Sequence, residues 1–331
     1  MTALASAERG VGEFAVVDAL PEFVVVIFAA VTHLADPWFL FGLLALAYWF
    51  ASDRFAASPR RAGATAIAVV TCGYAAVALG KVVFAAPRPP GAVPPVDVPA
   101  WLPGLLSVWY EGQVFSDGFG FPSGHATGGA AAYVALALLY DRPWTPRRRL
   151  AAAAAVAVAV AVSRVVIEVH FLVDVVVGVL VGVAVVAVAL RLAGDPRLRG
   201  VETTADPAEP TPVLDPSPVF LLAAGVSTLA AAVAVANGHT GDVVEAGIGV
   251  ATGLGGAVGW SLVDGDEPVV PARVAVPALF VTGGLWVGAS AFSSSLIVTV
   301  AATSTAVAVV IGLPALPRAF SKNSGSASVR S

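Results

Sequence analysis

Ionisable side chains beside the apolar runs of this chain gather in three short segments, and the first carries two cations. Lys81 and Arg88 stand seven residues apart, which is about two turns of an α-helix. Both side chains can then face one way, and Pro87 and Pro89 end such a helix. Arg presents a planar fork and Lys a point charge, so the pair suits a multiply charged anion with phosphate-like oxygens.

The second segment, Pro122-Ser123-Gly124-His125, stands where a loop enters an apolar run. Ser123 fits the N-cap position, and Gly124 lets a ligand approach the backbone closely. Free N–H groups and the helix dipole at such an end favour an anion. His125 then lies in the first helical turn, where it could donate a proton to a leaving group.

The third segment runs from Ser163-Arg164 to His170 and Asp174. His170 and Asp174 are spaced i, i+4, so they share a face of a helix. A carboxylate there can accept a hydrogen bond from one ring nitrogen and leave the other free as a nucleophile. Arg164, at the end of the preceding apolar run, is the next cation available to the same anion.

Each of these features has an ordinary structural explanation when it is taken alone. A histidine or arginine at the end of a span commonly lies at the interface, where long side chains snorkel. Together, two of the four histidines, three of the eighteen basic residues and a carboxylate converge on one face of the membrane. This convergence favours an anion site, and it leaves phosphorus chemistry and anion transport both open.

The order and spacing of the three segments resemble the signature of the type-2 phosphatidic acid phosphatase family, which shares its site with vanadium haloperoxidases. The pattern is K-x6-R-P, then P-S-G-H, then S-R-x5-H-x3-D, and the resemblance covers roughly residues 14–191. The signature positions are Lys81, Arg88, Pro89, Pro122, Ser123, Gly124, His125, Ser163, Arg164, His170 and Asp174.

The resemblance implies a metal-independent phosphoester hydrolase that needs no cofactor. It implies that His170 attacks phosphorus and becomes a phosphohistidine, with Asp174 orienting it. It also implies that His125 protonates the leaving oxygen and then activates water. The phosphate-binding residues that it implies are Lys81, Arg88, Ser123, Gly124 and Arg164.

The composition shows that such a site must sit in a membrane protein. Of the 331 residues, 58% are hydrophobic and 12% are charged, and the mean hydropathy is +0.86. Soluble domains carry about 25% charged residues, so the composition excludes a disordered chain and an ordinary cytosolic enzyme. The net charge of −4 offers no basic field for nucleic acid. The single cysteine, Cys72, excludes an internal disulfide framework and a cysteine-rich metal site.

Uncharged apolar runs predict an all-α, polytopic membrane helix bundle of ten spans, since a crossing needs about 20 mostly apolar residues. The first span is interrupted by Asp18, Pro21 and Glu22, so this stretch could instead lie partly in the interface. The predicted spans are 14–34, 37–52, 62–83, 123–140, 149–167, 170–191, 217–236, 243–263, 274–290 and 295–313.

These spans divide the chain into two membrane regions joined by a polar segment. We expect a six-span phosphatase core over 1–195, a polar linker over 196–216, and a four-span region with a short polar tail over 217–331. The family core does not need the last four spans. The GxxxG spacings in the glycine-rich span 246–263 predict close helix packing, within the chain or in a homo-oligomer.

The basic residues predict the orientation of the bundle, because cytoplasmic loops carry an excess of Lys and Arg. With the N-terminus inside, fifteen of the eighteen basic residues fall in inner segments. The exceptions, Lys81, Arg88 and Arg164, all fall on the outer side. We therefore expect a multi-pass protein of the cell membrane with cytoplasmic N- and C-termini and an active site that faces the extracytoplasmic side.

The leading prediction is a membrane lipid-phosphate phosphatase that acts on a polyprenyl diphosphate, phosphatidic acid or phosphatidylglycerol phosphate. Its partners would be that substrate and membrane lipids, and not nucleic acid. A lipid phosphotransferase of the same superfamily and a non-enzymatic anion or lipid transporter are the alternatives. Transport predicts that His125 and His170 are dispensable while Arg88 and Arg164 are needed.

Overall fold

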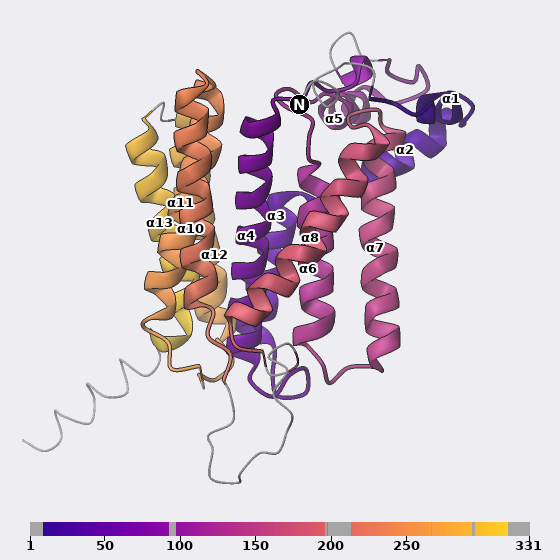
Figure 1. Ribbon diagram of the computed structural model, residues 1–331. Coiled ribbons are helices and arrows are strands. Elements are labelled where there is room, and N and C mark those ends of the chain that lie inside the picture. The colour runs from indigo at the N-terminus through magenta and orange to yellow at the C-terminus, as the bar shows by residue number, and fades with distance from the viewer. Residues whose placement is uncertain are drawn as a thin grey trace, which may run out of the picture.

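A computed structural model describes residues 9–92, 97–195, 197, 213–265, 267–292 and 295–316 (Figure 1). Across these ranges the regular structure is helical. The α-helices are α1 (Glu13–Val17), α2 (Glu22–Val31), α3 (Pro37–Phe50), α4 (Pro59–Phe84), α5 (Gly104–Val114), α6 (Gly124–Leu139), α7 (Pro146–Val166), α8 (Leu172–Leu192), α10 (Ser217–Ala236), α11 (Thr240–Trp260), α12 (Ala272–Phe292) and α13 (Leu296–Gly312). Short 3-10 segments lie at η1 (Thr32–Ala35), η2 (Pro90–Ala92) and η3 (Leu313–Ala315).

The long helices form one multi-pass membrane bundle (Figure 1). Among the described helices, seven are long and apolar enough to cross a bilayer: α4, α7, α8, α10, α11, α12 and α13. Residues Glu22–Ala35, which comprise α2 and η1, form a bent pair of helices with α3, and the bend is 49°. This bent pair is an eighth candidate for a membrane span. α6 is apolar but has only 16 residues. The predicted fold class is therefore confirmed.

The first of the ten predicted crossings, over residues 14–34, is wrong. The stretch is broken into α1 and α2, and the ten residues of α2 span only about 15 Å. Pro21 precedes α2, and the Glu22 carboxylate accepts a hydrogen bond from Trp101 Nε1 at 2.8 Å in the loop that carries α5. The stretch therefore stays near one end of the bundle, as the interfacial alternative predicts.

The predicted placement of Arg9 on the side of the membrane opposite the site is also wrong. Arg9 forms an ion pair with Asp174, at the start of α8, with 3.0 Å between Nη1 and Oδ1. Because α2, η1 and α3 make one bent element instead of two crossings, the chain before α1 lies at the same end as the start of α8. Arg9 thus joins Lys81, Arg88 and Arg164 as a basic residue at that end.

α8 crosses α6 at close range because two glycines on α8 leave no side chain between the helices. A Cβ at Gly178 would lie 2.8 Å from the Ser123 carbonyl oxygen, and one at Gly182 would lie 2.6 Å from that of Thr127. The backbone N–H of Ser123 also donates to the Asp174 carbonyl at 3.0 Å. These contacts hold the N-terminus of α6 beside the N-terminus of α8.

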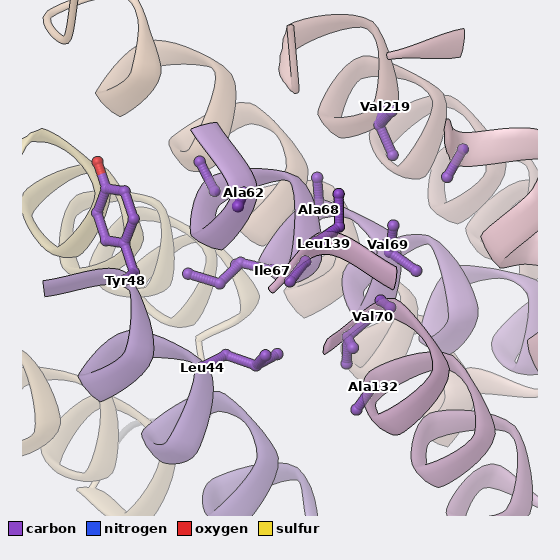
Figure 2. Packing of buried hydrophobic residues seen from close by; sticks show 14 of the residues in the cluster. Leu44, Tyr48, Ala62, Ile67, Ala68, Val69, Val70, Ala132, Leu139 and Val219 are labelled. Carbon is purple, nitrogen blue, oxygen red and sulfur yellow. The ribbon is translucent and has the colours of Figure 1, made fainter. Parts of the chain in front are cut away.

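α4 is the central helix, and its residues fill the main apolar core (Figure 2). Tyr48 Oη on α3 donates to the Ile311 carbonyl at 2.6 Å, so the end of α13 is tied to the same core. The core residues in Figure 2 come from α3 (Leu44, Tyr48), α4 (Ala62, Ile67, Ala68, Val69, Val70), α6 (Ala132, Leu139) and α10 (Val219).

The C-terminal helices thus pack directly on α3 and α4. Most of the predicted linker 196–216 and the tail after residue 316 lie outside the described residues. The division of the chain into a core, a linker and a C-terminal region stays a prediction.

The glycine pairs of α11 face two different neighbours within the chain. A Cβ at Gly253 would lie 2.7 Å from a backbone atom of α10, and one at Gly255 would lie 2.4 Å from a backbone atom of α13. Gly249 likewise faces α10, and Gly259 faces α13. The predicted close packing is confirmed as packing within the chain, and self-association through this span stays a prediction.

Candidate active site

The three predicted segments meet at the end of the bundle where α4 and α7 end and α6 and α8 begin. Arg88 joins the first segment to the third, since its Nη1 donates to the Val169 carbonyl at 3.0 Å and lies 3.1 Å from His170 Nε2. Its Nε donates to the Asp117 carbonyl at 2.8 Å. The backbone bond between Ser123 and Asp174 joins the second segment to the third.

His170 lies in the turn between α7 and α8, and only 2% of its surface is exposed. Since a guanidinium can only donate, the contact with Arg88 makes Nε2 the acceptor and leaves the ring proton on Nδ1. Nδ1 lies 3.5 Å from Asp174 Oδ2. Burial, together with the guanidinium groups of Arg88 and Arg164, holds the pKa of His170 well below its usual value of 6.5. The imidazole is therefore neutral near pH 7, with the Nε2 lone pair toward the cations.

Asp174 is fully buried and is held on both oxygens. Oδ1 accepts from Arg9 Nη1 at 3.0 Å, and Oδ2 accepts from the Phe171 backbone N–H at 3.0 Å. The Arg9 guanidinium also donates to the Pro87 carbonyl and lies 4.9 Å from the centre of the Phe171 ring. Arg9 thus fixes the carboxylate and neutralises it at the same time.

The N-terminus of α6 carries the second segment as predicted. Ser123 is the N-cap, and its Oγ accepts from the Ala126 backbone N–H at 3.4 Å. A Cβ at Gly124 would make an ordinary 3.6 Å contact with Val77, so packing does not require a glycine there. His125, in the first turn, lies with Nε2 2.8 Å from Asp36 Oδ1.

Asp36 is bonded to the predicted site residue His125, but it was not itself predicted from the sequence. It stands at the break between η1 and α3, and its Oδ2 lies 2.5 Å from His33 Nδ1 and accepts from Trp38 Nε1 at 2.9 Å. His33 Nε2 in turn accepts from Trp109 Nε1 at 2.9 Å. This network, formed by His33, Asp36, His125 and the two tryptophans, fixes one nitrogen of His125 and leaves Nδ1 for a substrate.

Arg164, at the end of α7, is buried, and its Nη1 donates to Thr32 Oγ1 at 2.6 Å. Its Nε is buried without a hydrogen-bond partner among the described residues. Arg164 and Arg88 both act electrostatically on His170. A second buried guanidinium therefore lies beside the imidazole with donor capacity to spare.

Lys81 lies at the same end of the bundle, but its ion pair leads to the C-terminal helices. Its Nζ lies 3.2 Å from both carboxylate oxygens of Glu245 on α11. Burial lowers the pKa of Arg88, and nearby carboxylates, Asp174, Asp117 and Glu245, oppose that shift. Glu245 therefore acts electrostatically on two of the predicted phosphate-binding cations, although it lies far outside the three segments.

Sequence reasoning located the eight predicted site residues at one end of the bundle, but it missed three charged residues bonded to them and a histidine bonded to one of those three. The missed groups are Arg9, His33, Asp36 and Glu245. Among the described residues, no group of three or more His, Cys, Asp and Glu side chains is arranged to hold a metal ion.

The PAP2 superfamily model matches residues 62–197, a segment that contains all three signature motifs. Comparison with curated proteins and comparison with solved structures each gave no match. The motifs and the helical fold agree with this match, and residues 62–197 form a PAP2 superfamily segment within the chain.

Proposed function

We propose that this protein is a membrane lipid-phosphate phosphatase that works through a phosphohistidine intermediate. The observation that carries the proposal is the state of His170, which is buried and neutral and turns Nε2 toward Arg88. A phosphate bound between the two arginines would replace the contact between Arg88 and His170 and bring phosphorus to the nucleophile. Superfamily membership supports a phosphatase-type activity on lipid phosphates.

In the first step, the Nε2 lone pair of His170 forms a bond to phosphorus as the bond from phosphorus to the lipid oxygen breaks. His125 gives its proton to that oxygen, so the lipid leaves as an alcohol or, from a diphosphate, as a monophosphate. The phosphorylated His170 ring becomes positively charged, and the Asp174 carboxylate, 3.5 Å from Nδ1, stabilises this charge.

In the second step, water attacks phosphorus and the bond from phosphorus to Nε2 breaks. Neutral His125 takes a proton from the water, which restores its acid form, and His170 returns to its neutral form. Inorganic phosphate is the second product. The residues proposed to hold the phosphoryl oxygens are Lys81, Arg88, Ser123, Gly124 and Arg164.

Asp36 supports the change of role that His125 undergoes between the two steps. Its carboxylate, 2.8 Å from Nε2, favours a positive charge on the ring and fixes the ring plane. Nδ1 is then the nitrogen that exchanges a proton with the lipid oxygen and later with water. Asp36 is thus proposed as a positioning residue for the general acid and base.

The site lies at the ends of membrane helices, which suits a lipid whose phosphate lies at the interface and whose chain lies in the bilayer. The opposite end of the bundle carries most of the basic loop residues, including Arg54, Arg147 and Arg148. The positive-inside rule therefore supports a cytoplasmic position for that end and an extracytoplasmic site.

The test is phosphate release by the purified protein in detergent with EDTA present. The substrates are phosphatidic acid, phosphatidylglycerol phosphate and a polyprenyl diphosphate. We expect release that EDTA leaves unchanged, loss of release in His170→Ala, and near-normal release in the matched histidine variant His239→Ala. Unchanged release in His170→Ala contradicts the mechanism, and loss of release with EDTA contradicts metal independence.

A second arm adds an alcohol acceptor and measures where the phosphoryl group goes. Release to water supports the phosphatase, whereas transfer that grows with the acceptor at the expense of phosphate release identifies the phosphotransferase. A protein that moves lipid phosphate between vesicles with both His125 and His170 replaced, and that hydrolyses none, is a transporter.

A further inference from the structure

A cavity of about 560 Å³ lies inside the bundle, between α3 and α4 on one side and helices α10 to α13 on the other. Its walls are almost entirely apolar and include Phe41 and Ala45 on α3, Ile67 on α4, Leu279 on α12 and Val307 on α13. The family-matched segment contributes only the α4 wall. The C-terminal helices therefore create a cavity that the superfamily segment alone does not have.

The cavity is elongated along the helix axes. Four residues of α4 line it, from Ile67 through Thr71 and Tyr74 to Ala78. The eleven residue steps from Ile67 to Ala78 correspond to about 16 Å of helix, or about half of the roughly 30 Å hydrocarbon core of a bilayer. At the end away from the site the lining includes Ile311, whose carbonyl accepts from Tyr48.

The other end of the cavity reaches the candidate active site at two points. Glu245 lines the cavity and forms the ion pair with Lys81. Trp38 lines it too and donates to the same Asp36 that is bonded to His125. A molecule in the cavity would thus extend from the phosphate-binding cations into the apolar interior.

We propose that this cavity binds one hydrocarbon chain of the lipid phosphate whose headgroup occupies the active site. The inference rests on the proposed function and extends it from the headgroup to the chain. The lining favours an apolar occupant, because it is mostly apolar and Glu245, the only charged residue among the described residues that line it, is at the end that faces Lys81. A chain whose phosphate lies beside Lys81 would enter the cavity at the end that Glu245 lines.

Two glycines allow the cavity to be filled without disturbing its walls. Gly42 on α3 and Gly283 on α12 both line it, and a Cβ at either position meets no atom within 4 Å. Gly284, the next residue on α12, has the same open surroundings but does not line the cavity. Gly283→Phe and Gly284→Phe are therefore a matched pair that differs only in whether the ring enters the cavity.

The first measurement is kcat/KM for long-chain phosphatidic acid, a polyprenyl phosphate and the chainless ester p-nitrophenyl phosphate. We expect Gly42→Phe and Gly283→Phe to lower kcat/KM about tenfold or more for at least one lipid and less than twofold for p-nitrophenyl phosphate. The lipid that loses more identifies the chain type, and Gly284→Phe should leave all three values within twofold. Equal losses on lipid and chainless ester in both variants, or no loss in either, overturn the proposal.

The second measurement locates the chain directly and does not depend on turnover. A phosphatidic acid with a diazirine near the end of one acyl chain is photolysed with the full-length protein, and the labelled peptides are identified. We expect labels on α3 and α13 around Phe41 and Val307, and their loss in Gly283→Phe but not in Gly284→Phe. Labels confined to outward-facing residues such as Leu180 and Leu221 would overturn the proposal.

These two measurements separate the cavity from the proposed function. If the wild-type protein hydrolyses none of the three esters, the proposed function is wrong, and the photolabelling decides about the cavity. If it hydrolyses all three and the glycine variants keep the wild-type ratio of lipid to chainless ester, the cavity proposal alone is wrong.

Discussion

Two histidine–carboxylate pairs stand at the site, and their surroundings differ. His170 and Asp174 are both fully enclosed, and Asp174 is already paired with Arg9. His125 and Asp36 are partly open, and Asp36 is shared with a second histidine, His33. One carboxylate is thus neutralised by a guanidinium, and the other is surrounded by imidazole and indole N–H groups.

The difference matches the two tasks of a covalent phosphatase. A nucleophile must keep its lone pair, so the His170 pKa is best held low, and a carboxylate balanced by Arg9 does not oppose that shift strongly. A proton donor and acceptor must change charge in each cycle and reach water. Asp36 and the partial exposure of His125 suit that second task.

The largest expected effect comes from replacing the two histidines in turn. His170→Ala should lower kcat at least about 10⁴-fold on every ester, because the nucleophile is gone. His125→Ala should cost roughly 10²- to 10⁴-fold on lipid phosphates but much less in the first step with p-nitrophenyl phosphate, whose leaving group needs no proton. Rapid-quench kinetics should then show a burst of p-nitrophenol in His125→Ala alone. A burst in His170→Ala would reverse the assignment of the two roles.

The second-largest expected loss of activity comes from Asp36→Asn, which keeps the shape of the side chain and removes its charge. We expect kcat for lipid phosphates to fall about 10²-fold, since the amide cannot favour the charged form of His125. Asp36→Glu should recover part of the loss, and Asp141→Asn, at the other end of the bundle, should retain wild-type activity. If Asp36→Asn lowers the rate of the p-nitrophenol burst as strongly as it lowers the turnover of lipid, Asp36 does not act through the leaving-group proton.

The ion pair of Arg9 with Asp174 makes a prediction about pH. Arg9→Gln leaves the Asp174 carboxylate unbalanced, which stabilises protonated His170 and raises its pKa. Protonated His170 has no lone pair, so activity should be lost at a higher pH than in the wild type, by up to about one unit. The measurement is the fall of kcat/KM at low pH, made with the same ester for both proteins. Any titration of the ester then affects the two pH profiles equally. Arg148→Gln is the control, and an acid limb that stays in place in Arg9→Gln contradicts the role of Arg9.

The smallest effect tests the contact that holds the two pairs together. Gly182→Ala places a Cβ 2.6 Å from the Thr127 carbonyl oxygen, so α6 and α8 must move apart. We expect a destabilisation of ~1–3 kcal/mol, seen as a lower Tm in detergent, and a severalfold loss of activity. Gly225→Ala on α10, where a Cβ meets no atom within 4 Å, is the control. An unchanged Tm in Gly182→Ala would show that the two helices are not held by this contact.

Most of the bundle could be predicted because apolar runs of about 20 residues have few stable forms in a bilayer. α7, α8, α10 and α11 all appear close to where hydropathy places them. The prediction for the stretch 14–34 failed because its hydropathy resembles that of a span, while the helix is interrupted between Val17, where α1 ends, and Glu22, where α2 begins after Pro21. The number of apolar residues in this stretch could be counted from the sequence, but its hydrogen bond to the loop that carries α5 could not be predicted.

The three motifs predicted the site because their spacing encodes local geometry, such as the i, i+4 pair of His170 and Asp174. The groups that complete the site come from distant parts of the chain and follow no fixed spacing. Arg9 lies 165 residues from Asp174, and Asp36 lies 89 residues from His125. A signal for Asp36 did exist, since an acidic residue three positions after a histidine in an apolar stretch is costly unless it is paired.

Arg9, Asp36 and Glu245 all lie outside the matched segment 62–197, yet each is bonded to a motif residue inside it. The segment that the family model matches therefore does not contain all of the charged groups that are bonded to its motifs. A chimera that transplants residues 62–197 into another membrane scaffold would inherit the motifs without their counter-charges. The unit that such an experiment must move intact runs from Arg9 to the start of α11.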